Sequence, residues 1–520
     1  MAVSTEKVLE SVGGFGWYQL RLCFMLGYMC LFVSMVLMVM TFSTAEPPWK
    51  CTLNSTSCTL NGTFKLGDDN FDLRCKIQRS DWEFSVERDF DSIVTEWDLV
   101  CDNAVYVSIV NSTTFLLFIF GSMLSSLVSD KFGRKPVVYP FGLFACLCGF
   151  LSAFAQTYWV FALFRSLAGI GVGGFTICSF VLVIEYTGEP YRSRVGFSIW
   201  YAWVLALVLL ALLGYLIPSW RTLSIATSVP GVVSVIFWWF SPESLRWLIV
   251  KGRTDEAIKV LQDIARVNKK VPPDDDVVLE KSGITENQKL GNIKDLFATK
   301  TIGLRTLISW YCWGVSGLVY YGISLSTPSV GGNMYLNFFI SAVCEGIGMM
   351  IGIFLLDKMG RKKTIVANVW LAGLAMVVGA VLKFYDDGGD GYLAGKVISS
   401  MVLGKVFIII VFDGVYIYTS EMFPTVVRNT AMGTSTSAAR IGSATAPYII
   451  YSERVHALMP FSFMAVAAVV CGILCLLLPE TSKTSMPDTV QQVQKNGGNC
   501  SQAMMALNIE DEDDDAQKFT

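Results

Sequence analysis

Long apolar runs alternate with short polar segments along the chain. A run of roughly 20 mostly apolar residues is long enough for a helix to cross a membrane. Twelve runs predict such spans, at 22–42, 104–128, 137–157, 158–184, 195–217, 222–240, 306–327, 335–356, 364–382, 397–420, 430–451 and 458–478. They lack the two-residue alternation of a transmembrane barrel. The pattern predicts an all-α polytopic membrane protein with twelve transmembrane helices.

Composition narrows the class further. Of the 520 residues, 53% are hydrophobic and only 16% are charged, against about 25% charged in soluble chains. The net charge of −3 gives no sign of a nucleic-acid partner. The only histidine is His456, and no phosphate loop, metal-ligand cluster or nucleophile–base pair is evident. We therefore expect neither an enzyme nor a cofactor, catalytic or metal site.

Lysine and arginine are distributed unevenly between the loops. Cytoplasmic loops of membrane proteins are enriched in these residues. The loops after spans 2, 4, 8 and 10 carry Lys131, Arg134, Lys135, Arg192, Arg194, Lys358, Arg361, Lys362, Lys363 and Arg428. Short loops on the other side carry only Arg221, Lys383 and Arg454. Both termini are therefore predicted to be cytoplasmic.

The segment 43–103 follows the first span and is therefore expected outside the cell. It holds glycosylation acceptors at Asn54 and Asn61, whereas a third, Asn111, falls inside span 2 and is expected to stay unmodified. Four cysteines in an extracellular loop favour two disulfides, with three possible pairings. These cysteines are Cys51, Cys58, Cys75 and Cys101.

The segment 241–305 is expected on the cytoplasmic side. Thr254 is predicted to cap a helix whose apolar stripe packs under the bundle; a calmodulin target is the alternative, disfavoured by a polar face of mixed sign. The stripe consists of Ala257, Ile258, Leu261, Ile264 and Ala265. The predicted organisation is an N-terminal segment 1–21, a first bundle 22–240, this linker, a second bundle 306–478 and an acidic tail 479–520.

Three landmarks occur twice in the chain. Asp130-Lys-Phe-Gly-Arg-Lys135 pairs with Asp357-Lys-Met-Gly-Arg-Lys362, Glu185/Arg192 with Glu421/Arg428, and Pro242-Glu-Ser with Pro479-Glu-Thr. The offsets are 227, 236 and 237 residues. Such agreement indicates a duplicated six-span unit and two halves related by a pseudo-two-fold axis along the membrane normal. Transporters that rock two halves around a midplane site have this architecture.

The duplicated charges are predicted to form a conformational latch on the cytoplasmic face, which breaks when the halves separate. The alternative is that they serve only as topological anchors. Both signs are duplicated, which favours the latch. Its predicted members are Asp130, Arg134, Lys135, Glu185, Arg192, Glu243, Asp357, Arg361, Glu421, Arg428 and Glu480.

The chain resembles the major facilitator superfamily, and within it the organic cation, organic anion and carnitine transporters. The resemblance runs from Val12-Gly-Gly-Phe-Gly to Leu478-Pro-Glu-Thr. It is most specific in Ser92-Ile-Val-Thr-Glu-Trp-Asp-Leu-Val-Cys101, Pro242-Glu-Ser-Leu-Arg-Trp-Leu248, Tyr320-Tyr-Gly-Ile-Ser-Leu325 and Thr419-Ser-Glu-Met-Phe-Pro-Thr-Val-Val-Arg-Asn429. The long outer loop argues against a sugar carrier. Members usually have more cysteines in that loop, so their disulfide map does not transfer whole.

Ionisable residues inside spans are costly and are functional candidates by default. Glu345, Asp413 and Arg440 lie well inside their spans, and we expect them to line the pathway rather than form a structural network. For Arg165 and Lys405, snorkelling to the membrane interface or a structural ion pair is at least as good an interpretation as contact with a ligand.

The resemblance sharpens the assignment of these charges. It implies that Glu345 matches a pocket glutamate of the cation carriers and that Asp413 replaces a pocket glutamine. Arg440 stands where cation carriers have aspartate and where anion and carnitine carriers have arginine. Two carboxylates and one guanidinium in one cavity would suit a zwitterion, because arginine can bind a carboxylate with two hydrogen bonds.

Aromatic residues supply the candidate cation surface. Tryptophan and tyrosine rings attract quaternary ammonium groups, although aromatics are also common in spans for other reasons. The predicted pocket aromatics are Trp200, Trp203, Trp313, Tyr320, Tyr321 and Tyr416.

The sequence thus predicts a plasma-membrane carrier for small organic cations and carnitine-like zwitterions that works by alternating access. Its partners would be the substrate, the lipid bilayer and a coupling ion, sodium or proton, that the sequence does not specify. The alternatives are an organic anion exchanger of the same fold and a non-transporting receptor that uses the outer loop.

Overall fold

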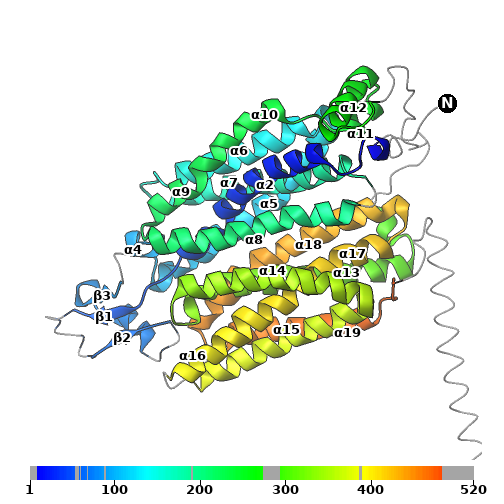
Figure 1. Cartoon of the computed structure of the whole chain (residues 1–520). Coiled ribbons are helices and arrows are strands. Elements are labelled where there is room, and N and C mark those ends of the chain that lie inside the picture. The colour runs from blue at the N-terminus through cyan, green and yellow to red at the C-terminus, as the bar shows by residue number, and fades with distance from the viewer. Residues whose placement is uncertain are drawn as a thin grey trace, which may run out of the picture.

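A computed structural model describes residues 9–482 except 53, 54, 56, 57, 59, 67, 69, 87–89, 189, 190, 273–292 and 386–388. Its long helices run side by side in two groups, which lie one above the other in Figure 1. The upper group contains α2 (Trp17–Met38), α5 (Val105–Phe132), α6 (Lys135–Ser152), α7 (Tyr158–Glu185), α8 (Arg192–Leu216), α9 (Trp220–Val233), η5 (Ser234–Ile236) and α10 (Phe237–Phe240). We call this group the N-half.

The lower group is the C-half. It contains α13 (Lys300–Leu325), α14 (Met334–Met359), α15 (Arg361–Phe384), α16 (Asp390–Lys396), η8 (Val397–Gly404), α17 (Lys405–Met422), α18 (Thr425–Tyr451) and α19 (Met459–Leu476). α16, η8 and α17 form one continuous span in which η8 is a π-helix. The halves meet mainly where α5 packs on α18 and where α8 packs on α14.

Ten helices in the described part of the chain are long and apolar enough to cross a membrane. The predicted spans on α13 and α18 are not among them, although these helices have 26 and 27 residues. Both are more polar because they pack closely against each other in the interior and carry several of the candidate pathway residues. With these two, the structure has the predicted twelve-helix, all-α architecture.

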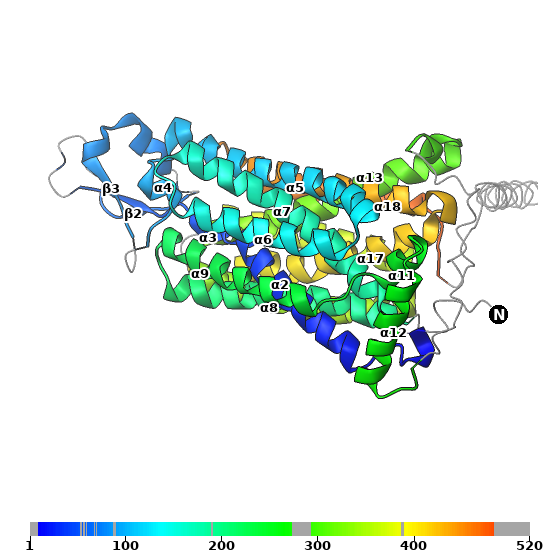
Figure 2. The same cartoon turned by 90° about the horizontal axis from the view of Figure 1, so that it is seen from above.

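The segment predicted to form the outer loop folds into a small domain at one end of the bundle (Figure 2), which we call the ectodomain after this prediction. Strands β1 (Trp49–Cys51), β2 (Thr63–Phe64) and β3 (Trp82–Phe84) form an antiparallel sheet in the order β2-β1-β3. Two short helices, η1 (Phe71–Lys76) and η2 (Arg79–Asp81), lie between β2 and β3 in the chain. Two more, α4 (Ile93–Glu96) and η3 (Cys101–Ala104), follow β3. The short segment α3 (Met40–Ser43) leads into the ectodomain from α2.

The two predicted disulfides are present, and their pairing is Cys51–Cys58 and Cys75–Cys101. Asn61 is exposed, whereas Asn54 lies outside the described residues. Asn111 is buried and donates from Nδ2 to the Val107 carbonyl at 3.0 Å. That the acceptor motif at Asn111 stays unmodified remains a prediction.

The motif at 92–101 fixes the ectodomain to the N-half. The Glu96 carboxylate accepts from Trp220 Nε1 at 2.8 Å and from Arg221 Nε at 3.1 Å. Arg221 also donates to the Ala153 carbonyl at 2.6 Å. One carboxylate thus joins the outer loop to the helix that begins at Trp220.

At the opposite end of the bundle lie α11 (Leu245–Val250) and α12 (Thr254–Asn268). The predicted stripe of α12 faces inward, with Ala257, Leu261, Ile264 and Ala265 buried. The prediction for its first residue is wrong: Thr254 is the first helical residue, and Arg253 occupies the cap position. Most of the linker, 273–292, lies outside the described residues.

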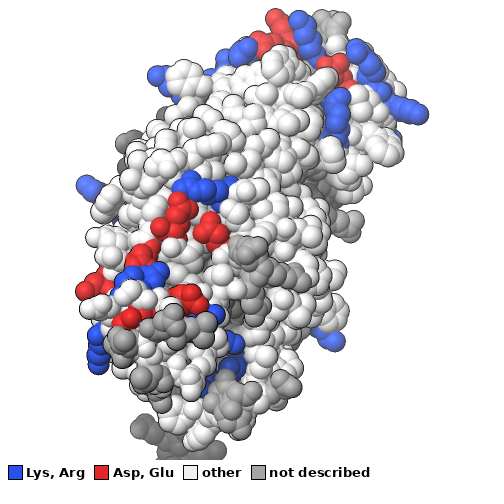
Figure 3. Space-filling model, turned by 90° about the vertical axis from the view of Figure 1, so that its left-hand side faces the viewer, with Lys and Arg blue, Asp and Glu red and all other residues white. Residues whose placement is uncertain are grey.

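Charged side chains are concentrated at particular parts of the surface. Figure 3 views the molecule from the ectodomain end. Its charged side chains, positive and negative together, form separate groups with a wide uncharged surface between the groups. A surface of this kind suits helices whose sides contact lipid.

Candidate functional site

A buried ion pair lies between α14 and α17. Lys405 Nζ is 3.3 Å from Glu345 Oε2, and each side chain is only 1% exposed. The ammonium also donates to Ser324 Oγ at 2.7 Å and lies 3.4 Å from the centre of the Tyr320 ring. Lys405 is therefore a structural ion partner and does not snorkel. Its charge compensates that of Glu345, which cannot be considered a free carboxylate.

Tyr320 connects this pair to the N-half. Its hydroxyl donates to Glu345 at 2.8 Å and accepts from Trp203 Nε1 at 3.0 Å. Trp203 lies on α8 and Tyr320 on α13, so this bond crosses between the halves. A second crossing contact joins the rings of Trp200 and Tyr416, whose centroids are 6.1 Å apart.

Arg440 occupies a different environment. Its Nη1 donates to the Tyr321 hydroxyl at 2.9 Å, and its guanidinium lies 4.1 Å from the centre of the Phe118 ring. Phe115, one turn earlier on α5, packs on Tyr321 with centroids 4.6 Å apart. Arg440 forms no ion pair with a carboxylate in the described part of the chain.

Asp413 lies on α17, near a group of aromatic side chains from α13 and α17. Trp313 packs on Tyr416 with centroids 4.3 Å apart and donates from Nε1 to Thr419 Oγ1 at 2.9 Å. Phe412 completes the group by contacting both rings. Asp413, three residues before Tyr416, has a buried Oδ2 without a hydrogen-bond partner. A buried carboxylate oxygen without a partner is costly and marks a place where a ligand could bind.

The structure thus brings the nine predicted pocket residues into one region between the halves. Sequence reasoning missed Phe115, Phe118 and Phe412, because single phenylalanines in apolar spans give no signal. Arg165 also differs from expectation: it is buried and donates to the Val36 carbonyl, so it neither snorkels nor pairs with a carboxylate.

A cavity of about 1010 Å³ lies between the halves at the ectodomain end. It is lined by residues of the ectodomain, of α5 and of α18, including Ser108, Asn111 and Pro447. Asn111 and Phe118 are seven residues apart on one face of α5, which is about 10 Å along the axis. We call this cavity the outer vestibule; it lies toward the ectodomain on the helix face that carries Phe118, and the hydrogen bond from Ser112 Oγ to the Ala444 carbonyl, 2.6 Å long, lies between the cavity and Arg440.

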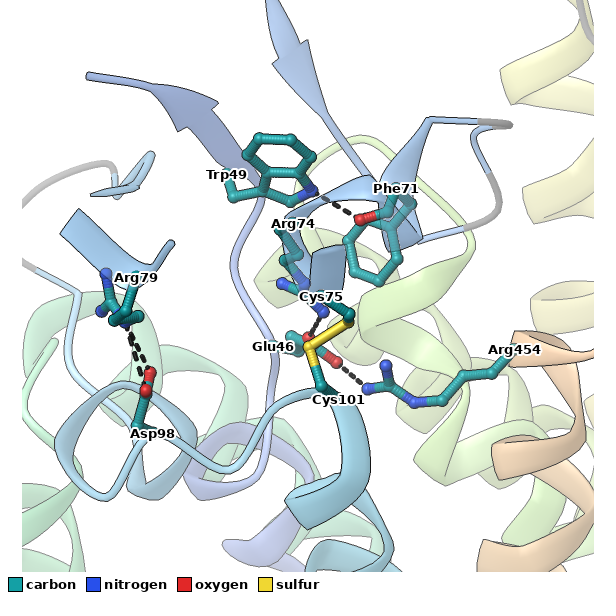
Figure 4. Close-up of a disulfide and its surroundings, with 9 residues drawn as sticks. All are labelled: Glu46, Trp49, Phe71, Arg74, Cys75, Arg79, Asp98, Cys101 and Arg454. Carbon is teal, nitrogen blue, oxygen red and sulfur yellow. Dashed lines mark hydrogen bonds and ion pairs between the residues drawn. A yellow bond between two sulfur atoms is a disulfide. The ribbon is translucent and has the colours of Figure 1, made fainter. Parts of the chain in front are cut away.

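Three charged residues hold the ectodomain to the C-half, and we call them the outer bridge. The carboxylate of Glu46 lies between the guanidinium groups of Arg74 and Arg454, next to the Cys75–Cys101 disulfide (Figure 4). Arg74 belongs to the ectodomain and Arg454 to the segment after α18. Burial lowers the pKa of Arg74, and the Glu46 carboxylate opposes this shift.

Glu46→Gln is expected to loosen the ectodomain, because it leaves the buried Arg74 guanidinium without a counter-charge. Loss of one partner of a buried pair costs about 3–5 kcal/mol. Limited proteolysis of the ectodomain in intact cells would measure the loosening. The control is Glu83→Gln, whose partner Lys50 is about half exposed, at 47%; equal proteolysis of both variants would contradict the role of Glu46.

The duplicated charges form two matching networks at the other end, which we call the braces. In the N-half, the backbone N–H of Arg134 donates to Glu243 at 2.7 Å, and its side chain pairs with Asp130 at 2.9 Å and Glu185 at 3.5 Å. Asp130 lies on α5 and Glu185 on α7, whereas Arg134 directly precedes α6 and Glu243 follows α10.

The C-half repeats the arrangement. The backbone N–H of Arg361 donates to Glu480 at 2.9 Å, and its side chain pairs with Glu421 at 3.1 Å and Asp357 at 4.0 Å. Every one of these pairs joins helices of the same half, so the geometry supports bracing of each half. A latch between the halves stays a prediction, as do the parts of Lys135, Arg192 and Arg428 in it; the side chain of Arg192 is outside the described residues.

Glu480 shows how strongly a brace holds its carboxylate. Burial raises the pKa of Glu480, but backbone N–H groups, those of Ser482 and Arg361 first among them, outweigh burial and keep it below the ordinary value. A carboxyl with a depressed folded-state pKa contributes stability above its unfolded pKa. That contribution is lost as the pH falls through the folded-state pKa.

Gly133→Ala is expected to break the N-half brace. Gly133 has a φ of +109°, and an added Cβ would lie 2.1 Å from Glu243 Oε2. The backbone strain costs about 1–3 kcal/mol, and displacement of Glu243 adds to it. Heating the detergent-solubilised protein and measuring the monodisperse fraction tests this. Gly62→Ala is the control, since Gly62 has the same φ but open space around it; equal losses would show that the carboxylate contact is unimportant.

Comparison with known proteins places these features in a family context. Residues 17–489 match the family described as "Sugar (and other) transporter". Human "Organic cation/carnitine transporter 2" is 33% identical over 80% of this chain and 74% of its own length. "Organic cation/carnitine transporter 4" of Arabidopsis thaliana is 31% identical over 93% of this chain and 90% of its own. The xylose transporter XylE from E. coli, in an inward open conformation, superposes with a TM-score of 0.62 at 14% identity, covering 90% of this chain and 98% of XylE; this likeness concerns the fold alone.

Proposed function

Because the chain belongs to the sugar and other transporter family of the major facilitator superfamily, and within it to the organic cation/carnitine transporters, we propose that it carries small organic cations and carnitine-like zwitterions across a membrane. The two halves would rock around the central site, as in other carriers built from two six-helix repeats. Substrate would pass through the outer vestibule to the region between Asp413 and Arg440.

One observation carries this proposal. Lys405 neutralises Glu345, whereas Asp413 has an unpartnered carboxylate oxygen and Arg440 has no carboxylate partner in the described chain. A zwitterion satisfies both: its cationic head would lie near Asp413 and the aromatic rings of Trp313 and Tyr416, and its carboxylate would bind Arg440. A simple organic cation would use only the first part of the site.

An organic anion exchanger is the second candidate, and Arg440 is the observation that favours it. A substrate with only carboxylates could bind this guanidinium. It would, however, face the negative charge of Asp413 in the same region, and like charges in a medium of low dielectric constant repel strongly. This argument ranks the cation and zwitterion first.

We also propose the plasma membrane as the location, with the ectodomain outside the cell and both termini in the cytoplasm. Two disulfides in the ectodomain support this orientation, since disulfides persist in oxidising compartments. The lysine- and arginine-rich loops lie at the opposite end, where the positive-inside rule requires them.

The test is paired uptake in cells that express the chain. Radiolabelled carnitine, tetraethylammonium and a dicarboxylate are compared at equal surface expression, each with and without sodium. We expect uptake of carnitine and tetraethylammonium above that of cells expressing an Asp413→Asn variant. Uptake of the dicarboxylate alone would establish the anion exchanger instead, and sodium dependence would identify the coupling ion.

A further inference from the structure

Three cysteines far apart in the sequence converge inside the C-half. Cys312 lies on α13, and Cys471 and Cys475 lie on α19. Their Sγ atoms all lie within 4.8 Å of one another, and all three residues are buried. This group could not be identified from the sequence, because the two segments are about 160 residues apart and the chain has a single histidine.

The spacing of the three cysteines along their helices places their thiols where they could bind one metal ion together. Residues four apart lie on the same face of a helix, so Cys471 and Cys475 present two sulfurs side by side, and Cys312 supplies a third from the neighbouring helix. Cys312 Sγ and Cys475 Sγ are 3.1 Å apart, which is closer than the roughly 3.5–4.0 Å of ordinary packing contacts. A zinc–sulfur bond is about 2.3 Å long, so two sulfurs on one zinc ion lie at most about 4.6 Å apart; the three Sγ atoms, all within 4.8 Å of one another, are close to this limit.

Charge favours a divalent ion. Three thiolates around a divalent ion leave a single net negative charge. The ammonium of Lys362 donates to the carbonyl of Leu476 at 2.6 Å, directly after Cys475, and so places a positive charge beside this end of the site. A site with near-zero overall charge is the arrangement that a low-dielectric interior tolerates best.

We propose that Cys312, Cys471 and Cys475 form a thiolate site for a divalent thiophilic ion of the zinc group. Soft sulfur ligands select such ions over magnesium or calcium. The third sulfur distinguishes this site from a disulfide, which would use only two. Cys312 directly precedes Trp313, so an ion here would fix α13 to α19 next to the proposed pathway. Binding releases the thiol protons, so affinity rises with pH.

Cadmium, as a spectroscopic probe for this class of ion, provides the test. The full chain, purified in detergent under argon without a reducing agent so that the two ectodomain disulfides stay closed, is dialysed against Cd²⁺, and bound metal is measured together with cadmium–thiolate absorption. We expect about one tightly held ion per chain, lost in Cys312→Ala and in Cys475→Ala. Cys178→Ala should retain it, because the Cys178 thiol is buried elsewhere and contacts the Ser125 carbonyl at 3.7 Å.

Equal cadmium content in all variants would mean that the ion binds elsewhere and would overturn the proposal. So would a wild-type chain that binds no cadmium, or a purified chain in which Cys312 and Cys475 form a disulfide and no metal is bound. Size-exclusion profiles confirm that each variant is folded. The binding measurement needs no transport, so its failure would leave the proposed carrier function untouched, and a failed uptake assay would not affect this result.

Discussion

Lys405→Met is expected to be the most damaging single substitution in the C-half. The change leaves the Glu345 carboxylate buried without its counter-charge, and the ammonium contact with the Tyr320 ring is lost as well. Removing one member of a buried ion pair costs about 3–5 kcal/mol. We expect little protein at the cell surface and a marked loss of thermal stability in detergent.

A double variant separates charge compensation from packing. Glu345→Gln with Lys405→Met removes both charges and keeps the approximate volumes, so it should recover most of the stability that Lys405→Met loses. Lys358→Met, at an exposed position on α14, should behave like the unmodified chain. If Lys405→Met were as stable as Lys358→Met, the pair would not be structural and Glu345 would again be a candidate for direct substrate contact.

Arg440→Ala is expected to separate zwitterions from simple cations. A hydrogen bond to a charged group is worth about 1.5–3 kcal/mol, so uptake of carnitine at low concentration should fall about 10- to 100-fold. Tetraethylammonium has no carboxylate, and its uptake should change far less. Initial uptake rates of the two substrates, normalised to surface protein, measure the difference.

Arg440→Lys provides the matched variant for this experiment. Lysine keeps the charge but cannot bind a carboxylate with two parallel hydrogen bonds, so an intermediate loss for carnitine is expected. An equal fall of carnitine and tetraethylammonium uptake in Arg440→Ala would show that Arg440 supports the structure through Tyr321 and Phe118. The carboxylate assignment would then be wrong.

The spans, the repeat and the candidate pocket residues were readable from the sequence because each leaves a local or periodic signal. Charges in spans stand out, and the doubled Asp-Lys-x-Gly-Arg-Lys turns identify the two halves. The partners of these charges were not readable. From the linear sequence Glu345 could pair with Arg440 or Lys405, and only the packing of α14 against α17 selects Lys405.

Contacts between distant segments were missed for the same reason. The outer bridge joins Arg74, Glu46 and Arg454, whose outermost members Glu46 and Arg454 are 408 positions apart, and nothing near any of the three predicts the other two. The π-helical η8 before Lys405 also leaves no periodic signal, since a π-turn adds a residue without changing an apolar run. Three-dimensional packing, and not local preference, determines these features.

The braces have a consequence for how the chain is made. Glu243 and Glu480 lie just after the last helix of their halves and are therefore the last brace members to leave the ribosome. Domains synthesised first generally fold first. The N-half can therefore complete its brace and fold in the membrane while the C-half is still being translated. In each half, the last contact of the brace can form only after a single glutamate, Glu243 or Glu480, has been synthesised.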